Sequence, residues 1–221
     1  MEIRELNRKP LRADIHQEIR GRILKSEFRP HDRLKDTSLA AALGTSRTPV
    51  REALIRLERE GFLENSVGRG FRVRSLTSTE VREVYPIIWT LESLALRDCE
   101  PHNAEEIKKL HELIVAMERS GTDPATRIEL DKEWHAILCG KCENTYLKKL
   151  IEDLKATTYR YEFAFMEVQE HTKNSTREHR EVLSLLKNGD VTKAVKALKG
   201  HWQSGMQAIL KGIADQEGAV T

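Results

Sequence analysis

Four side chains of the kind that bind metal ions lie on apolar helix faces in the C-terminal two-thirds of the sequence. Asp131 and His135 are spaced i and i+4 in RIELDKEWHAIL, on an otherwise apolar face. His179 begins a similar stripe in HREVLSLL, and His201 lies among small and apolar residues of the last predicted helix. Burying one such group without a partner costs on the order of 2–7 kcal/mol, so the sequence predicts that the four meet.

A carboxylate and three neutral imidazoles around one point form a site for a divalent transition metal, with zinc or nickel expected, and leave positions for water or a ligand. The alternative is a set of hydrogen-bonded core histidines, the commoner role of any one of them taken alone. The remaining histidines lack such settings and are expected at the surface or an interface: His16, His31, His102, His111 and His171.

A second group of residues has the types and spacing of a DNA-reading helix. Arg47 and Arg51 are four apart and, with Thr48, occupy a solvent-facing arc at the start of a helix. Pro49 lies in the first turn, where a missing N–H costs nothing. Arginine side chains there can address guanine edges or phosphates in a major groove. The alternative is an ordinary helical hairpin with solvated arginines. The inward face of this helix is Val50, Ala53, Leu54 and Leu57.

The elements around this helix predict a helix–turn–helix unit with a wing. An apolar stripe of Leu39, Ala42 and Leu43 precedes Gly44, which tolerates the positive φ of a sharp turn, and Ser46 is a good N-cap. Beyond the helix, Gly61 is the expected stop. Short strands are predicted at residues 62–63 and 71–73, with Gly68-Arg69-Gly70 turning between them as a basic wing tip.

The rest of the chain predicts a mainly α protein of two domains. A helix at about 11–25 should pack behind the helix–turn–helix unit, and the polar link SLTST sets a boundary near residue 76. Residues 1–76 would form the DNA-binding domain, and residues 77–221 an antiparallel helical bundle for effector binding and dimerisation. Apolar residues of 3.6-residue periodicity place its helices at about 78–99, 103–120, 123–140, 143–169, 171–188 and 190–214.

Composition and charge agree with this division. Residues 1–76 hold 17 basic and 11 acidic side chains, a net of +6, whereas the remainder has a net of −4. The sequence contains no apolar run of membrane-spanning length, and MEIRELNRKP is too polar for a signal peptide, so we expect a cytoplasmic protein. The pair Cys139 and Cys142 lacks the context of a redox or zinc motif and is interpreted as two thiols at a helix end.

The sequence resembles a known family over nearly its whole length. The stretches GTSRTPVREALIRLEREGFLE and GRGFRV resemble the winged helix–turn–helix of the GntR family of bacterial transcription factors. The match runs from about Leu11 to Val73 and implies contacts to double-stranded DNA. The residues implied are Arg47, Thr48, Pro49 and Arg51 of the recognition helix and Arg69 and Gly70 of the wing.

The C-terminal domain resembles the FCD effector domain of the same family. The stretches that carry this resemblance are DKEWH and REHREVLSLLKNGDVTKAVKALKGHW. In the metal-binding members of that domain the positions of Asp131, His135, His179 and His201 are ligands, and all four match. The first helix of such domains often reads Arg-x-x-Leu-Glu, the Arg being associated with a carboxylate effector, but here Ile88 takes its place. An organic-acid effector is therefore in doubt.

Three functions compete at this point, beside a purely structural adaptor, which would not account for Arg47 and Arg51. The leading hypothesis is a homodimeric, ligand-responsive regulator, expected to be a repressor, that binds a pseudo-palindromic operator. A metal sensor, with the ion itself as the signal, is the second, and the loss of the Arg at position 88 favours it. The third is a metal-dependent hydrolase, which leaves the helix–turn–helix unexplained and has no obvious extra base. Candidates for the missing effector-binding charge or hydrogen bond are Arg160, Tyr161 and Arg177.

Overall fold

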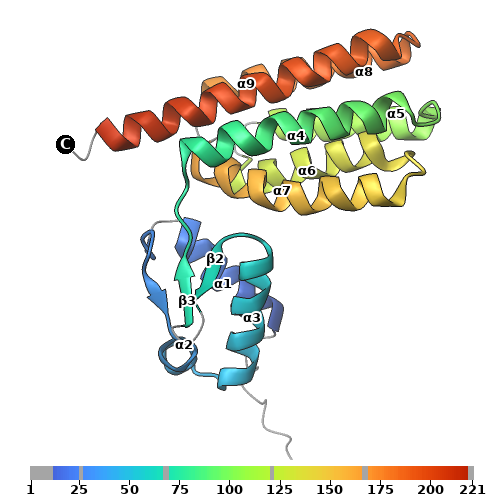
Figure 1. Cartoon of the computed structure of the whole chain (residues 1–221). Helices are drawn as coiled ribbons and strands as arrows, with labels where there is room; N and C mark the ends of the chain where they lie inside the picture. Colours follow the sequence, from blue (N-terminus) through green and yellow to red (C-terminus); the bar gives the residue numbers. More distant parts are fainter. Residues whose placement is uncertain (1–11, 25–26, 67–69, 120–121, 166–168, 219–221) are drawn as a thin grey trace, which may run out of the picture. The chain divides into compact units, whose positions relative to one another are not determined.

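The computed structural model describes residues 12–24, 27–66, 70–119, 122–165 and 169–218 (Figure 1). The chain divides into two compact units, residues 1–76 and residues 77–221. Within the described ranges, every helix is too short or too polar to span a lipid bilayer.

The first unit is a helix–turn–helix followed by a wing, which confirms the predicted fold. Its elements are α1 (Arg12–Leu24), β1 (Arg33–Leu34), α2 (Asp36–Ala42), α3 (Arg47–Arg59), β2 (Leu63–Ser66) and β3 (Gly70–Val73). The strands form an antiparallel sheet of order β1-β3-β2, in which Leu34 lies opposite Phe71 and Leu63 opposite Val73. Strand β1 was not predicted, because two residues are too few for an alternating pattern to be seen.

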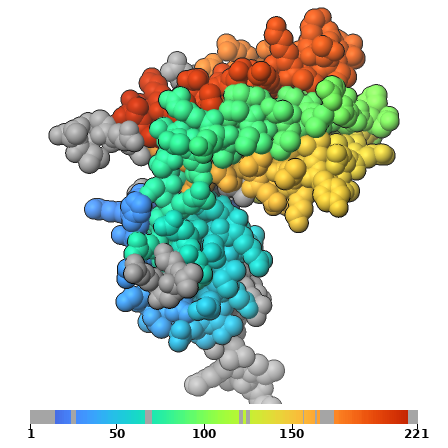
Figure 2. Space-filling model, in the orientation of Figure 1, coloured from blue at the N-terminus to red at the C-terminus, as the bar shows by residue number. Residues whose placement is uncertain are grey.

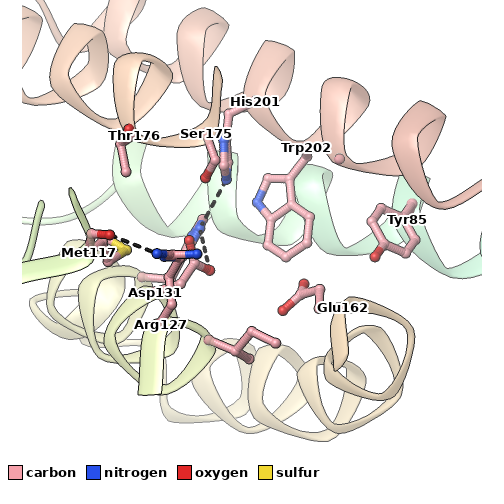
Figure 3. Close-up of a pocket in the computed structure, with 12 residues that line it drawn as sticks. Tyr85, Met117, Arg127, Asp131, Glu162, Ser175, Thr176, His201 and Trp202 are labelled. Carbon is pink, nitrogen blue, oxygen red and sulfur yellow. Dashed lines mark hydrogen bonds and ion pairs between the residues drawn. The ribbon is translucent and has the colours of Figure 1, made fainter. Parts of the chain in front are cut away.

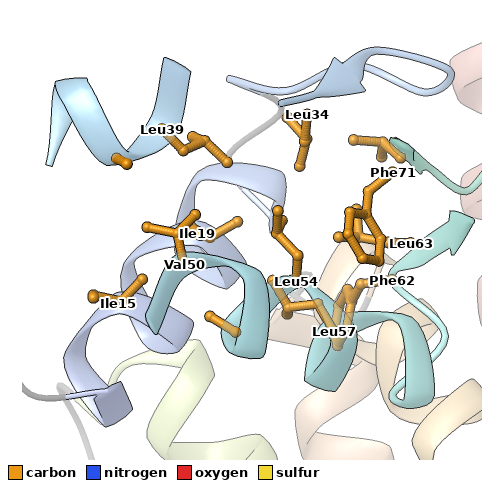
Figure 4. Close-up of a cluster of buried hydrophobic side chains, with 13 residues drawn as sticks. Ile15, Ile19, Leu34, Leu39, Val50, Leu54, Leu57, Phe62, Leu63 and Phe71 are labelled. Atoms are coloured by element: carbon orange, nitrogen blue, oxygen red, sulfur yellow. The ribbon is translucent and has the colours of Figure 1, made fainter. Parts of the chain in front are cut away.

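The core of this unit explains which face of α3 is left for DNA. Val50, Leu54 and Leu57 are fully buried against Ile19 of α1 and Phe71 of β3 (Figure 4). The buried side chains recur at the helical period, so the residues between them face solvent. Gly44, with a φ of +61°, makes the turn between α2 and α3, as predicted.

Two local predictions in this unit are wrong, and a third holds for the position of the residue but not for its hydrogen bond. Ala42 is exposed and Ala40 is buried instead, because α2 is only seven residues long and ends at Ala42. His16 is not a surface residue: it is buried, and its Nε2 lies 2.7 Å from Glu60 Oε2. Ser46 holds the N-cap position of α3, but its side chain makes no hydrogen bond to the helix backbone.

The second unit is a helical bundle, again as predicted. Its helices are α4 (Ser78–Arg97), α5 (Ala104–Glu118), α6 (Pro124–Gly140), α7 (Thr145–Phe165), α8 (Gln169–Lys187) and α9 (Val191–Gly218). The helices α8 and α9 pack together, α4 packs on both α9 and α7, and α5 packs on both α6 and α8. On the face drawn in Figure 2, α4 in green lies between α9 in red and the yellow α6–α7 layer.

Side-chain caps fix where most of these helices begin. The side chains of Thr77, Asn103 and Asp123 each accept a hydrogen bond from a backbone N–H of the first turn that follows. Asn144 and Asp190 do the same for α7 and α9. Each bond satisfies an N–H that has no partner within the helix, which typically contributes about 1 kcal/mol. The boundaries therefore follow from residues that are visible in the sequence.

The cysteines of this unit are free thiols. Cys139 and Cys142 are buried at the end of α6, as expected, and Cys99 is half-buried. Burial raises the pKa of the Cys139 thiol well above its ordinary value. A thiol in this state is a poor nucleophile and a poor metal ligand at neutral pH.

Candidate functional site

The structure brings the four predicted metal-binding side chains to one point in the bundle. Asp131 and His135 project from α6, His179 from α8 and His201 from α9. One ligand atom from each lies within 4.8 Å of the other three. The three histidines are at most 7% exposed, so the cluster forms part of the core of the bundle.

Two carboxylates determine which nitrogens of the cluster carry protons. His135 Nδ1 lies 2.8 Å from Glu92 Oε2, and His201 Nδ1 lies 3.0 Å from Glu178 Oε2. A carboxylate can only accept, so each Nδ1 carries a proton, and in the neutral form of either ring the lone pair is on Nε2. These two Nε2 atoms face each other at 3.3 Å. Neither can donate to the other in this tautomer, so the contact lacks a proton that would make it a hydrogen bond.

His179 completes this arrangement without a hydrogen-bond partner of its own. Its ring is fully buried, and neither nitrogen makes a hydrogen bond, although Nε2 lies 3.3 Å from Asp131 Oδ1. Burial, with the neighbouring imidazoles adding to it, holds the pKa of His179 well below its ordinary value. Burial also lowers the pKa of His135, although Glu92 opposes the shift. Both rings are therefore neutral at pH 7, the form that binds metals.

Glu92 is the central acceptor behind the cluster. It is fully buried, and besides His135 it accepts from Trp202 Nε1 at 2.7 Å and lies 2.8 Å from Lys155 Nζ. Burial raises the pKa of Glu92, but His135 and Lys155 outweigh that effect, and the net pKa is well below its ordinary value. Lys155 stays protonated beside it, its pKa raised by Glu92 against the effect of burial. The pair is thus an ionised buried bridge.

Sequence reasoning missed these supporting residues, although one of them carried a signal. Glu92 continues the buried stripe of α4 that includes Tyr85 and Ile88, and an acidic residue on such a face needs a partner. The stripe could have identified Glu92 as a buried, paired carboxylate. Glu178 and Lys155 lie on mixed faces with no such pattern, so their roles depend on the tertiary packing.

A small cavity opens beside the cluster. It has a volume of about 50 Å³, and its wall includes Asp131, His135 and His201 (Figure 3). Glu162 of α7 and Tyr85 of α4 also line it, beside Trp202. The other lining residues are Met117, Arg127, Ile128, Ser175, Thr176 and Gly205. A ligand in this cavity would contact the metal-binding side chains directly.

The residues expected to bind an effector in place of the arginine that Ile88 replaces do not line this cavity. Ile88 is fully buried in the core. Arg160 pairs with Glu80, and the hydroxyl of Tyr161 donates to the same carboxylate at 2.5 Å, at the start of α4. Arg177 is exposed. None of the three candidates lines the cavity, because each belongs to another face of its helix.

The candidate DNA-binding residues of α3 are displayed as predicted. The side chains of Arg47 and Arg51 are 65% and 64% exposed, and Thr48 is exposed between them. Asp36 of α2 holds both arginines, with its Oδ2 3.1 Å from Arg47 and 3.7 Å from Arg51. The hydrogen bond from Arg47 lowers the pKa of Asp36. Exposed ion pairs of this kind are weak, so phosphate or base edges can replace Asp36 as partners.

The other predicted DNA-binding positions are only partly described. Pro49 is half-buried in the first turn of α3. Gly70 begins β3 with a φ of +77°, a conformation that favours glycine at the return from the wing. Arg69 lies outside the described residues.

The fold and the two sites define a class of protein, a winged helix–turn–helix DNA-binding unit joined to a helical domain with a candidate metal centre. Comparison with known proteins agrees. Residues 11–73 match the family described as bacterial regulatory proteins, gntR family, and residues 83–204 match the FCD domain. The chain belongs to the GntR family and is a DNA-binding transcriptional regulator with an FCD domain, not an enzyme.

Individual relatives match over most of their length. The Nta operon transcriptional regulator of Aminobacter aminovorans is 32% identical over 196 residues, which cover 88% of this chain and 90% of that protein. The HTH-type transcriptional repressor RspR of Escherichia coli K12 is 25% identical over 205 residues, 90% of this chain and 89% of its own. The crystal structure of a GntR family member from Pseudomonas syringae pv. tomato is 26% identical, with a TM-score of 0.56 over 97% of this chain and 92% of that one.

Proposed function

We propose that the protein is a ligand-responsive transcriptional repressor whose operator affinity is set by a small molecule bound at a divalent metal centre in the second unit. The observation that carries the metal centre is the pair of Nε2 atoms of His135 and His201, 3.3 Å apart with both lone pairs turned inward. Two such lone pairs repel each other unless a cation neutralises them.

The other side chains fit the same ion. Asp131 supplies a carboxylate oxygen, and His179 supplies a buried nitrogen that has no hydrogen bond. Glu92 and Glu178 orient two of the imidazoles, as carboxylates commonly do behind metal-ligating histidines. Three imidazoles and a carboxylate suit zinc or nickel. When bound, such an ion would supply a Lewis acid to which an oxygen of the effector can coordinate.

Operator recognition is assigned to the first unit. Arg47 and Arg51 are candidates for base discrimination, while Thr48, Pro49, Arg69 and Gly70 would contact the backbone or the groove. A homodimer would read a pseudo-palindromic site, since a two-fold dimer matches a two-fold operator. A protein with this task acts in the bacterial cytoplasm. Repression is supported by the name of the related E. coli protein.

A metal sensor is the second candidate, and Ile88 favours it. A buried isoleucine cannot clamp a carboxylate, so the ion itself could be the signal. The two candidate functions differ in how readily the bound metal ion exchanges with solvent. The metal of an effector-binding site should co-purify with the protein, whereas a sensed ion should dissociate at cellular concentrations.

Operator affinity measured in three states of the protein tests the proposal. An operator would first be selected from genomic fragments. Fluorescence anisotropy would then measure the affinity of this operator for the metal-stripped, the zinc-loaded and the ligand-treated protein. The probes are lactate, malate, citrate, glycine and β-alanine. We expect at least one probe to change the operator affinity of the loaded protein about 5–150-fold, the usual range of allosteric coupling.

The outcomes of this experiment separate the candidates. A change produced by zinc alone, with no further effect of any probe, would favour the metal sensor. Operator binding that ignores both metal and probes would contradict the proposal, because a ligand shifts an equilibrium only by its differential affinity for two states.

A substitution at Glu92 tests the support of the metal centre. Glu92→Gln leaves Lys155 without its counter-ion in a largely buried position and weakens the orientation of His135. We expect a loss of about 3–5 kcal/mol in the free energy of unfolding and a 10–100-fold loss of zinc affinity. Urea unfolding and competition with a chelating dye would measure the two.

The matched control for this substitution is the double variant Glu92→Gln/Lys155→Met. It removes both charges of the buried pair, so it should recover much of the stability and little of the zinc affinity. Equal stability of Glu92→Gln and the parent would contradict the assignment of Glu92 as the central acceptor.

A further inference from the structure

The cavity beside the metal-binding cluster carries acidic groups, and its one basic side chain is already engaged. Among the described residues that line it, Arg127 is the only lysine or arginine. Its Nε donates to Met117 O at 3.1 Å and its Nη2 to Thr122 O at 3.2 Å. These bonds hold the guanidinium against the backbone at the end of α5 and the start of α6. Apart from the metal ion, a carboxylate effector would therefore find no lysine or arginine side chain of the cavity wall directed at it.

Glu162 and Tyr85 supply oxygen atoms that have no hydrogen-bond partner within the described residues. The hydroxyl of Tyr85 is buried, its residue being 1% exposed, and it makes no hydrogen bond. Glu162 also lines the cavity, and no ion pair or hydrogen bond holds its carboxyl among the described side chains. The two residues lie on the same side of the cavity, beside Trp202 (Figure 3). Burial, with the charge of Asp131 adding to it, raises the pKa of Glu162 to about 8, although the charges of Lys155 and Lys132 oppose the shift.

We propose that the cavity selects a small amine-bearing carboxylate, an amino-acid-like effector whose ammonium group is bound by Glu162 and the hydroxyl of Tyr85. The inference rests on the proposed function, since the carboxylate of the ligand would take the open position at the metal centre. An ammonium group offers three donors and a positive charge, and both oxygens can accept. The ammonium group would favour release of the Glu162 proton to solvent, and the bond to the resulting carboxylate would be charge-assisted and thus stronger than a neutral one.

Other ligand groups fit the part of the cavity lined by Glu162 and Tyr85 less well than an ammonium group. A second carboxylate would be repelled by Asp131 and would find no opposite charge at Glu162. A hydroxyl group could make one hydrogen bond but would supply no charge. Tyr85 and Trp202 form an aromatic wall here, with their rings edge to face and their centroids 5.7 Å apart, and Lys155 Nζ already lies over the Trp202 ring, 5.6 Å from its centroid.

The size of the cavity limits the ligand. A volume of about 50 Å³ holds roughly four water-sized groups, since one buried water needs about 10–15 Å³ by this measure. Glycine and β-alanine are of this order. Each has a hydroxy acid of the same shape, glycolate and 3-hydroxypropionate, in which a hydroxyl replaces the ammonium group. The pairs isolate the contribution of the amine.

The test is isothermal titration of zinc-loaded full-length protein with these four probes. We expect glycine or β-alanine to bind at least about tenfold more tightly than its hydroxy analogue, as one charge-assisted hydrogen bond implies. In Glu162→Gln this preference should disappear, while the affinity for the hydroxy acid stays the same or rises. Tyr85→Phe should reduce the preference without abolishing it. Glu133→Gln, at an exposed glutamate of α6 paired with Lys109, is the matched control and should behave like the parent.

Several results would overturn the inference. A hydroxy acid that binds as well as its amine partner would show that Glu162 does not select an ammonium group. Zinc-loaded protein that binds none of the four probes would exclude this ligand class, while the metal centre itself would stand. Protein that does not take up zinc would instead remove the proposed function, and the inference with it. Glu162→Gln is close to isosteric, and its unfolding temperature would show whether it folds.

Discussion

Replacing His179 and His201 together by alanine is expected to abolish metal binding. In the parent protein, zinc held at about 1,000 times its dissociation constant should stabilise the fold by about 4 kcal/mol. For a chain of this size, that corresponds to a rise in unfolding temperature of about 10 °C. The double variant loses two of three imidazoles, so added zinc should shift its unfolding temperature by less than about 2 °C. Thermal unfolding followed by circular dichroism measures the shift.

Two further variants make this result specific. His111→Ala removes an exposed histidine of α5 and should keep the full zinc-dependent shift. His179→Ala alone removes a ring whose nitrogens make no hydrogen bond, so its cost without metal should be that of a cavity only. A double variant that retains the zinc-dependent shift would show that the ion binds elsewhere.

Arg51→Ala is expected to weaken operator binding about 10–100-fold, with no effect on metal content. The side chain is 64% exposed at the start of α3, and its only described partner there is Asp36 at 3.7 Å. Loss of an arginine that reads a base typically costs about 1–3 kcal/mol and relaxes specificity at one position of the site. Fluorescence anisotropy with the operator and with single-base variants of it would measure both effects.

The salt dependence distinguishes base reading from phosphate contact. If Arg51 binds a phosphate, the variant should lose affinity for all sequences alike, and the slope of log affinity against log salt should fall by about one. Arg56→Ala is the control, since Arg56 is exposed on the same helix but pairs with Glu60 near its C-terminal end. Unchanged operator affinity in Arg51→Ala would show that α3 is not the recognition helix.

The helices and the positions of the candidate ligands could be predicted from the sequence because both depend on local pattern. Apolar periodicity located the six helices of the second unit, and caps such as Thr77 and Asp123 set their starts. The histidines of the cluster were visible because each interrupts an apolar stripe, where an unpaired polar group is costly. His16 shows the limit of this argument: its partner, Glu60, is 44 residues away, so nothing local indicated that it was buried.

The supporting residues of the site could not be predicted, because they depend on how helices meet. Glu178 reaches His201 from α8, and Lys155 reaches Glu92 from α7. Both are ordinary charged residues in the sequence, and only the packing of α4, α7, α8 and α9 gives them partners. Glu162 is similar, since neither its spacing nor its neighbours indicate that it lines a cavity.

Elemental analysis of the untagged protein tests the central claim most directly. The protein would be purified without chelators, and a second sample would be stripped and reloaded with zinc, nickel or manganese. We predict about one divalent transition metal ion per chain, held by Asp131, His135, His179 and His201. If neither sample holds metal, the cluster is a hydrogen-bonded histidine core. The DNA-binding regulator would stand, and the metal-centred control of its operator affinity would be contradicted.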